Sequence, residues 1–598
     1  MLDADPRAAY LGASVTTMDS DPPSEPSPSS RAWARLGLAL LLVVAAWLRL
    51  SGLEHGLPQT TEPDGLVFAA QTELIRSGAE HPERELLWGF YPQLVARLAS
   101  LLPAPAVPPE SEPLARLAAA AHDFFAPRLV VALLSLLSVP ASFALARRFL
   151  APGWSLAVSA LVASSTLTLW FAQQARPHAA AAALALVALV AALRVAEEGR
   201  WIDVLLAGVA AALALGALQF GVFVLPPILL AILLVRERGW AWRVAAALVV
   251  LAHAALGVLA FYPFLFAEGT PGGSHGVAGG ELELSGHRIY LELFNGAGLS
   301  ELIESFSAYD PWIALASLAG GCVLAARWLR GARADRERRR ALAIVLAYAL
   351  PFALALALYQ RTYQRFAIPL VPFLALAAVA GAACLARTRP RLALLAGLAL
   401  VLPQLGLGAR LATLRARPDT VAEASRWIET HLMPGVERVL FLPTFELPLP
   451  GDAASLEANA RMLDTRGRPW WRWQDALPAA QRAAAGWTLY AMPLQPSAQK
   501  LLAADPVRYL DALAADWFVV EVYREQRKPL LLDPIHPALP AVATRVARFA
   551  PEAPDFGDDL PLSWADDEYP RKECWALRLL CAERLGPVLE IWRAGPSR

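Results

Sequence analysis

Apolar runs of about twenty residues, long enough to cross a bilayer as helices, recur along this chain from residue 33 to residue 411. A chain in lipid has to pair its backbone polar groups internally, so runs of this length fold as membrane-spanning helices. The composition agrees, with 56% hydrophobic and 18% charged residues. We expect about eleven spans, at residues 33–50, 127–149, 154–173, 179–195, 202–220, 222–235, 244–266, 312–329, 341–359, 366–386 and 392–411. The predicted fold is therefore mainly α, that of a polytopic membrane protein.

Arginine is distributed unevenly between the connections of these spans. One alternate set of connections is rich in it, with Arg147, Arg148, Arg194, Arg200, Arg236, Arg238, Arg243, residues 327–340, Arg387, Arg389 and Arg391. The other set within the bundle holds Arg176, Arg288, Arg361 and Arg365. Because positively charged connections stay in the cytoplasm, we expect a multi-pass protein of the cell inner (plasma) membrane with a cytoplasmic N-terminus. Residues 57–125 and 267–310 then form exoplasmic loops, and the C-terminal region is exoplasmic or periplasmic.

Composition also divides the chain into three parts. Residues 1–30 are rich in Pro and Ser, cannot bury enough apolar surface to fold, and are expected to form a disordered cytoplasmic tail. Residues 31–414 hold the spans and form the transmembrane module. Residues 415–598 have the composition of a small soluble α/β domain, which we expect to be exoplasmic. Its segments with helix or strand periodicity are 420–432 for a helix and 438–443, 516–523 and 586–593 for short buried strands.

The charges exclude some classes of function. Lys+Arg and Asp+Glu are equal at 53 each, so the chain has no overall field that would recruit nucleic acid. His275, Glu281, Glu283 and His287 do not have the spacing of metal ligands, so we expect no metal. The cytoplasmic connections contain no glycine-rich phosphate loop, and no cofactor is predicted.

Two acids, Glu62 and Asp64, flank Pro63 in the first long connection. The same stretch matches a helix start, with Thr61 as N-cap, a proline in the first turn, and Gly78 available to end the helix. A cap accounts for one acid and not for both. Because acids packed against a membrane bundle usually serve a function, we favour the interpretation that this pair carries chemistry.

Arginines also occur where the positive-inside rule disfavours them. Arg176 and His178 stand in the exoplasmic connection 173–178, where snorkelling to the interface is the alternative to a functional role. Arg361 and Arg365 stand in another exoplasmic turn. They need a counter-anion, and a phosphate suits a guanidinium well. An ordinary ion pair with a loop acid is the alternative.

The second long connection begins with a glycine-rich stretch, residues 268–286, and continues into an amphipathic stretch, 288–306. Flexible glycine beside an amphipathic helix suits a gate over a cavity. A plain mobile linker is the interpretation that the sequence favours.

Four phrases in this order resemble the GT-C superfamily of polyprenyl-phosphate-sugar glycosyltransferases, of the protein O-mannosyltransferase and aminoarabinose transferase type (glycosyltransferase family 39). They are EPDG at 62–65, FYPQ at 90–93, ARPH at 175–178 and QRFAIPLVPFLALAA at 364–378. The family usually has Asp-Glu in the first loop, whereas Gly65 follows Asp64 here, and His178 stands where the family often has Asp. The resemblance covers residues 31–414 and implies a GT-C-like catalytic module there.

The resemblance implies an exoplasmic hexosyl- or pentosyltransferase with a polyprenyl-phosphate-linked sugar donor and a lipid, polysaccharide or protein acceptor. Asp64 would be the general base on an acceptor hydroxyl, with Glu62 assisting, in a single inverting displacement. Arginines would hold the departing phosphate, so that no metal is needed. Their order is Arg365 first, then Arg361 or Arg176. The candidate substrate contacts are His178, Tyr91 and Tyr363.

Two other classes of function also fit a large apolar bundle. A transporter or lipid flippase would place polar groups at mid-bilayer and show two related halves. Here the polar residues collect on one face and the halves look unrelated. A lipid-diphosphate-dependent oligosaccharide transferase or ligase would be distinguished by dependence on a metal ion.

Overall fold

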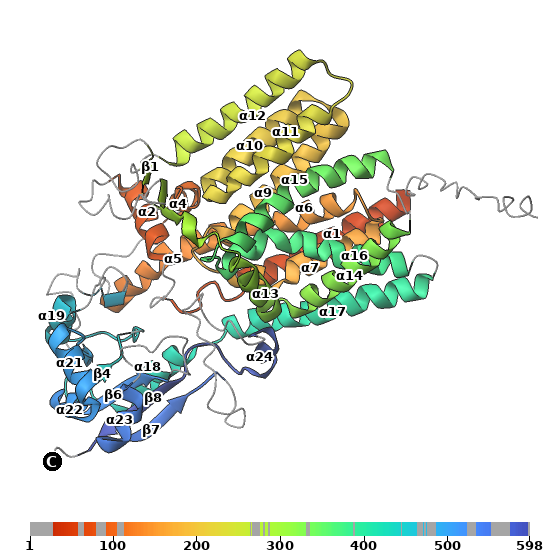
Figure 1. The fold of residues 1–598 in the computed structure, drawn as a ribbon. Coiled ribbons are helices and arrows are strands. Elements are labelled where there is room, and N and C mark those ends of the chain that lie inside the picture. The colour runs from red at the N-terminus through yellow and green to blue at the C-terminus, as the bar shows by residue number, and fades with distance from the viewer. Residues whose placement is uncertain are drawn as a thin grey trace, which may run out of the picture.

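The computed structural model describes residues 28–57, 65–78, 91–103, 113–262, 265, 275–278, 281–284, 287–330, 335–386, 389–443, 445–462, 470–471, 474, 486–522, 534–551 and 575–595. Glu62, Asp64 and residues 1–27 of the predicted tail lie outside these residues. Figure 1 shows a bundle of long helices with a smaller α/β unit at one of its ends.

The apolar runs form the bundle. Its helices are α1 (Pro28–Leu50), α5 (Pro113–Ser135), α6 (Ser138–Ala146), α7 (Pro152–Ser164), α8 (Thr166–Ala172), α9 (His178–Glu198), α10 (Trp201–Ala217), η2 (Gln219–Val224), α11 (Leu225–Leu234), α12 (Trp240–Phe261), α14 (Pro311–Leu329), α15 (Arg336–Leu358), η5 (Gln364–Leu370), α16 (Val371–Leu385) and α17 (Pro390–Arg415). Within the described residues, eight helices are long and apolar enough to cross a membrane, and the number is nine if α7 and α8, which are bent by 51°, count as one span. The helices α10 and η2–α11 are shorter and apolar. Each predicted run thus falls on a helix or helix pair, and the protein is a mainly α, multi-pass membrane protein.

The connection between α11 and α12 lies at the end of the bundle away from the α/β unit (Figure 1), and arginine joins neighbouring helices there. Arg340 donates to the carbonyl of Ala196, at 3.1 Å, and to that of Leu234, which joins the ends of α9 and α11. Arg148 pairs with Glu197 at 2.7 Å. A cation at a helix C-terminus pairs with carbonyls that have no partner within the helix, so Arg340 holds the ends of α9 and α11 together.

Small elements gather at the opposite end of the bundle (Figure 1). They are α2 (Gly65–Ser77), α4 (Leu94–Ser100), β1 (His275–Ala278), β2 (Glu281–Leu284), β3 (His287–Tyr290), η4 (Leu291–Leu293) and α13 (Gly298–Tyr309). Gly78, with φ +63°, follows the last residue of α2, as the sequence predicted. The interpretation of the glycine-rich stretch as a mobile linker is wrong for β1 to β3, which pair as an antiparallel sheet. Glycines 279, 280 and 286 fall between these strands.

The C-terminal unit has a five-stranded sheet in the order β5-β4-β6-β8-β7. The elements are α18 (Thr420–His431), β4 (Arg438–Phe441), α19 (Ala453–Met462), β5 (Thr488–Ala491), α21 (Pro496–Ala504), α22 (Pro506–Ala512), β6 (Trp517–Glu521), α23 (Ile535–Ala538), η8 (Leu539–Ala541), β7 (Ala543–Phe549), α24 (Trp575–Cys581) and β8 (Leu589–Ala594). Strands β5, β4 and β6 run parallel, and β8 and β7 complete the sheet antiparallel. The buried apolar cluster continues without a break from the bundle into this unit, through Leu414 and Val421. The two parts therefore share a core.

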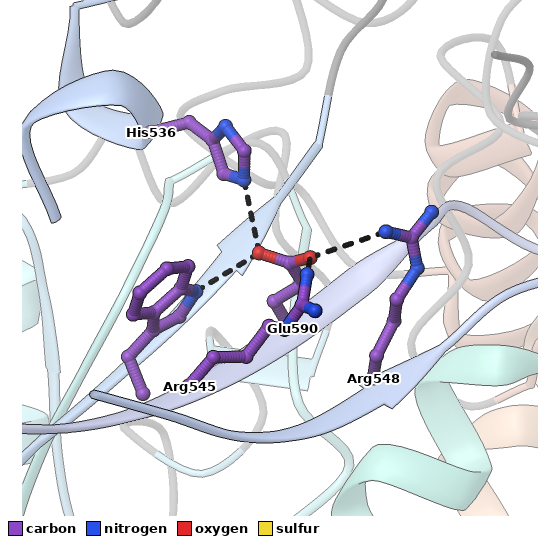
Figure 2. Close-up of polar contacts among 5 residues, drawn as sticks. His536, Arg545, Arg548 and Glu590 are labelled. Atoms are coloured by element: carbon purple, nitrogen blue, oxygen red, sulfur yellow. Dashed lines mark hydrogen bonds and ion pairs between the residues drawn. The ribbon is translucent and has the colours of Figure 1, made fainter. Parts of the chain in front are cut away.

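A buried carboxylate holds the antiparallel edge of this sheet (Figure 2). Glu590 of β8 has a side chain that is 1% exposed. It accepts hydrogen bonds from His536 at 2.9 Å, Arg545 at 2.7 Å, Trp592 at 3.0 Å and Arg548 at 3.4 Å. Burial alone would raise the pKa of Glu590, but the hydrogen bonds and charges of His536 and Arg545 hold it below the ordinary value of 4.5.

We predict that Glu590→Gln lowers the stability of the purified full chain by about 1–3 kcal/mol, because the amide replaces charge-assisted bonds and offers one oxygen in place of two. A carboxylate whose folded pKa is depressed stabilises above its unfolded pKa. The difference from wild type should therefore be present above pH 4.5 and shrink as the pH falls below it. Urea titration followed by tryptophan fluorescence, at neutral and acidic pH, measures both effects.

The matched control is Glu457→Gln, which removes an exposed pair with Arg461 whose side chains are 64% and 75% exposed. It should change stability by less than about 0.5 kcal/mol. An equal cost for both variants would show that the Glu590 cluster does not hold the sheet edge.

Candidate functional site

The polar connection 173–178, between α8 and α9, is buried at the bundle end nearest the α/β unit. Gln173 is fully buried, and Arg176 and His178 are 2% and 1% exposed. The Gln173 side-chain amide donates to the carbonyls of Leu48, at 2.9 Å, and Ser51, at 2.7 Å. Arg415 donates to the Gln173 carbonyl at 3.1 Å. The ends of α1, α8 and α17 therefore meet at this connection, which does not lie at the lipid interface as simple snorkelling would require.

Three of the residues predicted from the sequence converge here. Arg176 stands two positions before His178 in this buried connection, and Arg365 lies in η5. The ring of Phe366, the next residue after Arg365, lies 5.4 Å from the His178 ring between centroids. Because η5 packs against α9 at His178, two distant segments of the sequence bring Arg176 and Arg365 to the neighbourhood of His178. Two cations in a largely buried place favour an anion.

Aromatic rings orient Arg365. Its guanidinium carbon lies 4.4 Å from the centre of the Tyr363 ring and 5.2 Å from that of Phe366. Stacking of this kind stabilises a cation and fixes the plane of its donors. Tyr363 is therefore part of the same group of residues as Arg365.

Arg361 lies apart from this group of residues. It is exposed, and its guanidinium carbon lies 4.8 Å from the centre of the Tyr290 ring of β3. The contact joins Arg361 to the small sheet. The structure thus brings Arg176, His178, Tyr363 and Arg365 together and directs Arg361 toward β3.

The first connection reaches the same place through α2 and α4. The Tyr91 ring lies 5.1 Å from that of Phe68 on α2, and the Tyr91 carbonyl accepts a bond from Gln71 at 3.3 Å. Phe68 belongs to a buried cluster that contains Ala172 and Ala179, which flank the 173–178 connection. Helix α2, which begins one residue after Asp64, is therefore packed against the neighbourhood of Arg176 and His178.

Aromatic side chains line the bundle interior beside His178. Phe220 lies 6.4 Å from the His178 ring and 5.5 Å from Phe352, between ring centroids. Phe352 in turn contacts Phe223 and Tyr348, at 5.3 and 5.8 Å. The cationic group thus lies directly beside an apolar, aromatic interior.

A buried acid that the sequence analysis did not single out sets the bend in the α7–α8 span. Asp310 is fully buried. It accepts hydrogen bonds from Ser165 Oγ at 2.5 Å, from the Thr166 backbone amide at 2.8 Å and from the Gln404 side-chain amide at 2.8 Å. Gln404 also donates to the Ser164 carbonyl at 3.1 Å. The break in the helix leaves these backbone groups without helical partners, and side chains from α17 and from the start of α14 supply them. Helix α8 leads directly into the 173–178 connection.

A sequence signal for this network exists. Polar residues inside membrane spans are rare and are usually placed for a purpose. Ser164, Ser165 and Thr166 interrupt one apolar run and Gln404 interrupts another. Arg415, which contacts Gln173, and the buried His55 were also missed, since they lie just beyond the ends of the runs.

In the part of the chain that the structure describes, no group of three or more His, Cys, Asp or Glu side chains is arranged to hold a metal ion.

No family model and no curated protein matches this chain. Among solved structures, it is similar to the archaeal oligosaccharyltransferase AglB from Archaeoglobus fulgidus, in complex with an inhibitory peptide and a dolichol-phosphate, at 12% identity over 83% of this chain and 70% of that chain, with a TM-score of 0.45. It is also similar to ArnT from Cupriavidus metallidurans, at 15% identity over 87% of this chain and 97% of that chain, with a TM-score of 0.41. The structure of ArnT from Cupriavidus metallidurans bound to undecaprenyl phosphate is 15% identical over 87% of this chain and 96% of that chain, with a TM-score of 0.40.

At these identities and TM-scores the likeness assigns neither a family nor an activity to this chain.

We predict that Asp310→Ala destabilises the protein by about 3 kcal/mol, because it leaves the Ser165, Thr166 and Gln404 donors buried without an acceptor. Thermal unfolding of the purified chain in detergent measures the loss as a lower midpoint. The matched control is Asp335→Ala, since Asp335 is an exposed cap of α15 that accepts from the Arg338 amide at 2.8 Å, and it should cost about 1 kcal/mol. Equal midpoints for the two variants would contradict a structural role for the Asp310 network.

Proposed function

We propose that this protein is a membrane glycosyltransferase, which moves a sugar from a polyprenyl-phosphate donor to an acceptor hydroxyl on the exoplasmic side. The observation that carries the proposal is the convergence of Arg176 and Arg365 on His178 at a buried place beside the aromatic interior of a membrane bundle. A lipid phosphate needs such a combination, with cations for its head and an apolar environment for its chain.

The donor phosphate binds at Arg365 and Arg176 in this proposal. A guanidinium presents two parallel N–H groups to phosphate oxygens, and its charge offsets the negative charge that grows on the leaving phosphate. Arg365 is held by the Tyr363 and Phe366 rings, so little reorganisation is needed during the reaction. His178 lies beside the aromatic rings of Phe220 and Phe366, and in this proposal its ring contacts the bound phosphate or sugar.

Asp64 acts as the general base, and Glu62 assists or orients it. Asp64 precedes α2, and α2 packs through Phe68 on the cluster that flanks Arg176 and His178. The acceptor oxygen forms a bond to the anomeric carbon while the bond from that carbon to the phosphate oxygen breaks. The hydroxyl proton passes to Asp64, polyprenyl phosphate leaves, and the configuration inverts. Tyr91, which packs on Phe68, is a candidate substrate contact.

The arrangement of the chain in the membrane belongs to the same proposal. The arginine-rich end of the bundle faces the cytoplasm, in accordance with the positive-inside rule. Residues 31–414 form the catalytic module and residues 415–598 an exoplasmic or periplasmic domain that covers it. The protein then lies in the inner (plasma) membrane, and the transferred sugar is a hexose or a pentose.

The test is turnover by the purified full chain of a panel of polyprenyl-phosphate hexoses and pentoses, with release of free polyprenyl phosphate as the readout. We expect release with at least one donor, in the presence of a chelator. Release that depends on a divalent metal and a diphosphate donor would indicate an oligosaccharide transferase or ligase instead. Transport of the intact lipid without release would indicate a flippase.

We predict that Arg365→Ala lowers kcat/KM for the donor by about 100-fold or more, since it removes a cation that stabilises the departing phosphate. Arg361→Ala should cost less than about tenfold, because an exposed arginine stacked on Tyr290 contributes a weak, screened charge. Arg461→Ala, an exposed arginine of α19, serves as the unaffected control. Wild-type kinetics for Arg365→Ala would refute the phosphate assignment.

We also predict that Asp64→Asn lowers the rate of transfer by about 10²- to 10⁴-fold, the usual contribution of a general base. Glu62→Gln should have a smaller effect, in keeping with an assisting role. Elution as the wild-type species from size-exclusion chromatography confirms folding of each variant. Full activity of a folded Asp64→Asn protein would remove Asp64 from the mechanism.

A further inference from the structure

A groove of about 480 Å³ lies between α7 and α17, on the outer surface of the bundle. Its lining is apolar, and small residues make up much of it: Gly153, Ala157 and Ala160 on α7, and Ala393 and Gly397 on α17. It shares no lining residue with the candidate functional site. Its volume is in the range of sites that hold small molecules or parts of lipids.

The groove exists because α7 and α17 diverge. The two helices are in contact at the end of α7, where the Gln404 side-chain amide donates to the Ser164 carbonyl at 3.1 Å. Toward their first turns they separate. A Cβ atom on Gly397 would lie 3.9 Å from the Trp154 ring, and one on Gly153 would meet no described residue of another element within 4 Å.

The groove has the depth of one membrane leaflet. Helix α7 begins at Pro152 and α17 at Pro390, both at the open end of the groove. At 1.5 Å per residue, the lining residues Ala160 and Val401 lie about 12 and 16 Å below these starts. The hydrocarbon core of a bilayer is about 30 Å thick. The groove therefore extends from the membrane surface to about the middle of the bilayer, with Trp154 near the level of the head groups.

Lipid has direct access to the groove. Leu394 and Leu398, which line it, are 63% and 43% exposed and face outward from the bundle. A space that no atoms fill costs the dispersion contacts of every side chain around it. In a membrane, an acyl chain is the group that reaches such a space and restores those contacts.

The shape favours an acyl chain over a helix of a partner protein. Small residues let two membrane helices approach closely, so the lining alone would suit either occupant. A partner helix, however, crosses the whole bilayer and needs a contact face along its full length. The contact between Gln404 and Ser164 closes the groove halfway, which fits the length of a lipid chain in one leaflet.

Arginine stands at the open end of the groove. Arg147 donates to the Leu150 carbonyl at 2.8 Å, directly before Ala151, which lines the groove. Arg391 is exposed and stands one turn before Leu394, on the same face of α17. A guanidinium has five N–H donors, so the bond to Leu150 leaves most donors of Arg147 available to a phosphate.

Acidic residues do not cancel this charge. The sequence has no Asp or Glu from residue 124 to 196 or from 338 to 418, and these stretches contain both helices and the connections before them. Arg148, the neighbour of Arg147, is paired with Glu197 at 2.7 Å. This end of the bundle, with the N-terminal tail included, holds 20 arginines and 11 acids, counted over residues 1–35, 147–148, 194–203, 236–243, 327–340 and 387–391. Basic pockets between membrane helices bind the head groups of anionic lipids.

We propose that the groove binds one anionic phospholipid of the cytoplasmic leaflet, with its phosphate at Arg147 and Arg391 and an acyl chain along Ala157 and Gly397. The lipid fills the angle between α7 and α17 and thereby supports α7, which leads through α8 to the 173–178 connection. The binding site depends on no step of sugar transfer. Only the leaflet is taken from the membrane orientation under the proposed function.

The first test is direct binding. Native mass spectrometry of the purified, delipidated full chain compares phosphatidylglycerol with phosphatidylcholine of the same acyl chains. The first molecule of phosphatidylglycerol should bind wild type about tenfold more tightly, because the choline cation of the other lipid meets the same arginines. The double variant Arg147→Gln, Arg391→Gln should bind both lipids alike. Gly397→Leu, which places a side chain in the groove, should weaken both by about tenfold.

Matched controls exist for both changes. Gly406→Leu makes the same substitution at an exposed position of α17 outside the groove, where a Cβ atom has free space. The double variant Arg236→Gln, Arg330→Gln removes two exposed arginines from other connections. Both controls should bind as wild type does.

Two results of this measurement would overturn the proposal. One is equal affinity of wild type for the two lipids, or the same loss for Gly406→Leu as for Gly397→Leu. The other is a dimer of wild type that Gly397→Leu dissociates while lipid binding stays unchanged, which would assign the groove to a helix of a second copy.

The second test is stability in a bilayer. A ligand that binds the folded state raises the midpoint of thermal unfolding. Nanodiscs of phosphatidylcholine that contain some phosphatidylglycerol should therefore give wild type a higher midpoint than nanodiscs of phosphatidylcholine alone. Gly406→Leu should keep this shift, and the Arg147→Gln, Arg391→Gln variant should lose most of it. An equal shift in all variants would show an effect of membrane charge that does not involve the groove.

These readouts do not use turnover, so the two proposals fail separately. If the donor is turned over but wild type shows no lipid preference, the groove assignment is wrong and the transferase proposal stands. If no donor is turned over but the preference and its loss in the variants are measured, the lipid site stands and the transferase proposal is wrong.

Discussion

Carbonyl groups at the ends of membrane helices have no partner within the helix, and arginine supplies the partner at several helix ends of this protein. Arg340 holds the ends of α9 and α11 through Ala196 and Leu234. At the opposite end, Arg49 donates to the Ala163 carbonyl at 3.0 Å and Arg415 to that of Gln173. A guanidinium keeps its charge when buried and offers several donors, so one side chain satisfies two chain segments at once. The positions of the bundle ends, and of everything built on them, depend on these contacts.

The same constraint explains why the candidate site forms where it does. The break between α7 and α8 exposes backbone groups inside the bundle, and the Asp310 network with Ser165 and Gln404 satisfies them. Because the break directs α8 inward, the polar connection that follows it is buried and does not lie in the interface. Arg176 and His178 then face η5, which carries Arg365. A structural need for hydrogen bonds thus places Arg176 in a buried connection near Arg365, and cations placed together in this way favour an anion.

Much of this arrangement follows from the sequence, and the rest depends on contacts between distant residues. The lengths of the apolar runs located the membrane helices, because hydrophobicity is a local property of the sequence. The bend at Ser165 was missed because it needs Asp310, which lies 145 positions away in the chain. Strand β7 was missed because its outward charged residues, Arg545 and Arg548, are explained only by Glu590 on the neighbouring strand. Arg176 and Arg365 were found because each stands in a connection where the positive-inside rule disfavours arginine. The sequence did not predict that Arg361 lies apart from them, because the direction of each side chain depends on how η5 and β3 fold.

The short connection 173–178 links the end of α17 to the interior of the bundle. Gln173 accepts a hydrogen bond from Arg415 at 3.1 Å, whereas His178, five positions further on, lies 5.4 Å from Phe366 of η5 between ring centroids. Helix α9 continues from this connection into the bundle and fixes its far end. Groups built on separate loops would shift independently, but groups that share one short, buried segment keep a constant separation, as a preorganised site requires.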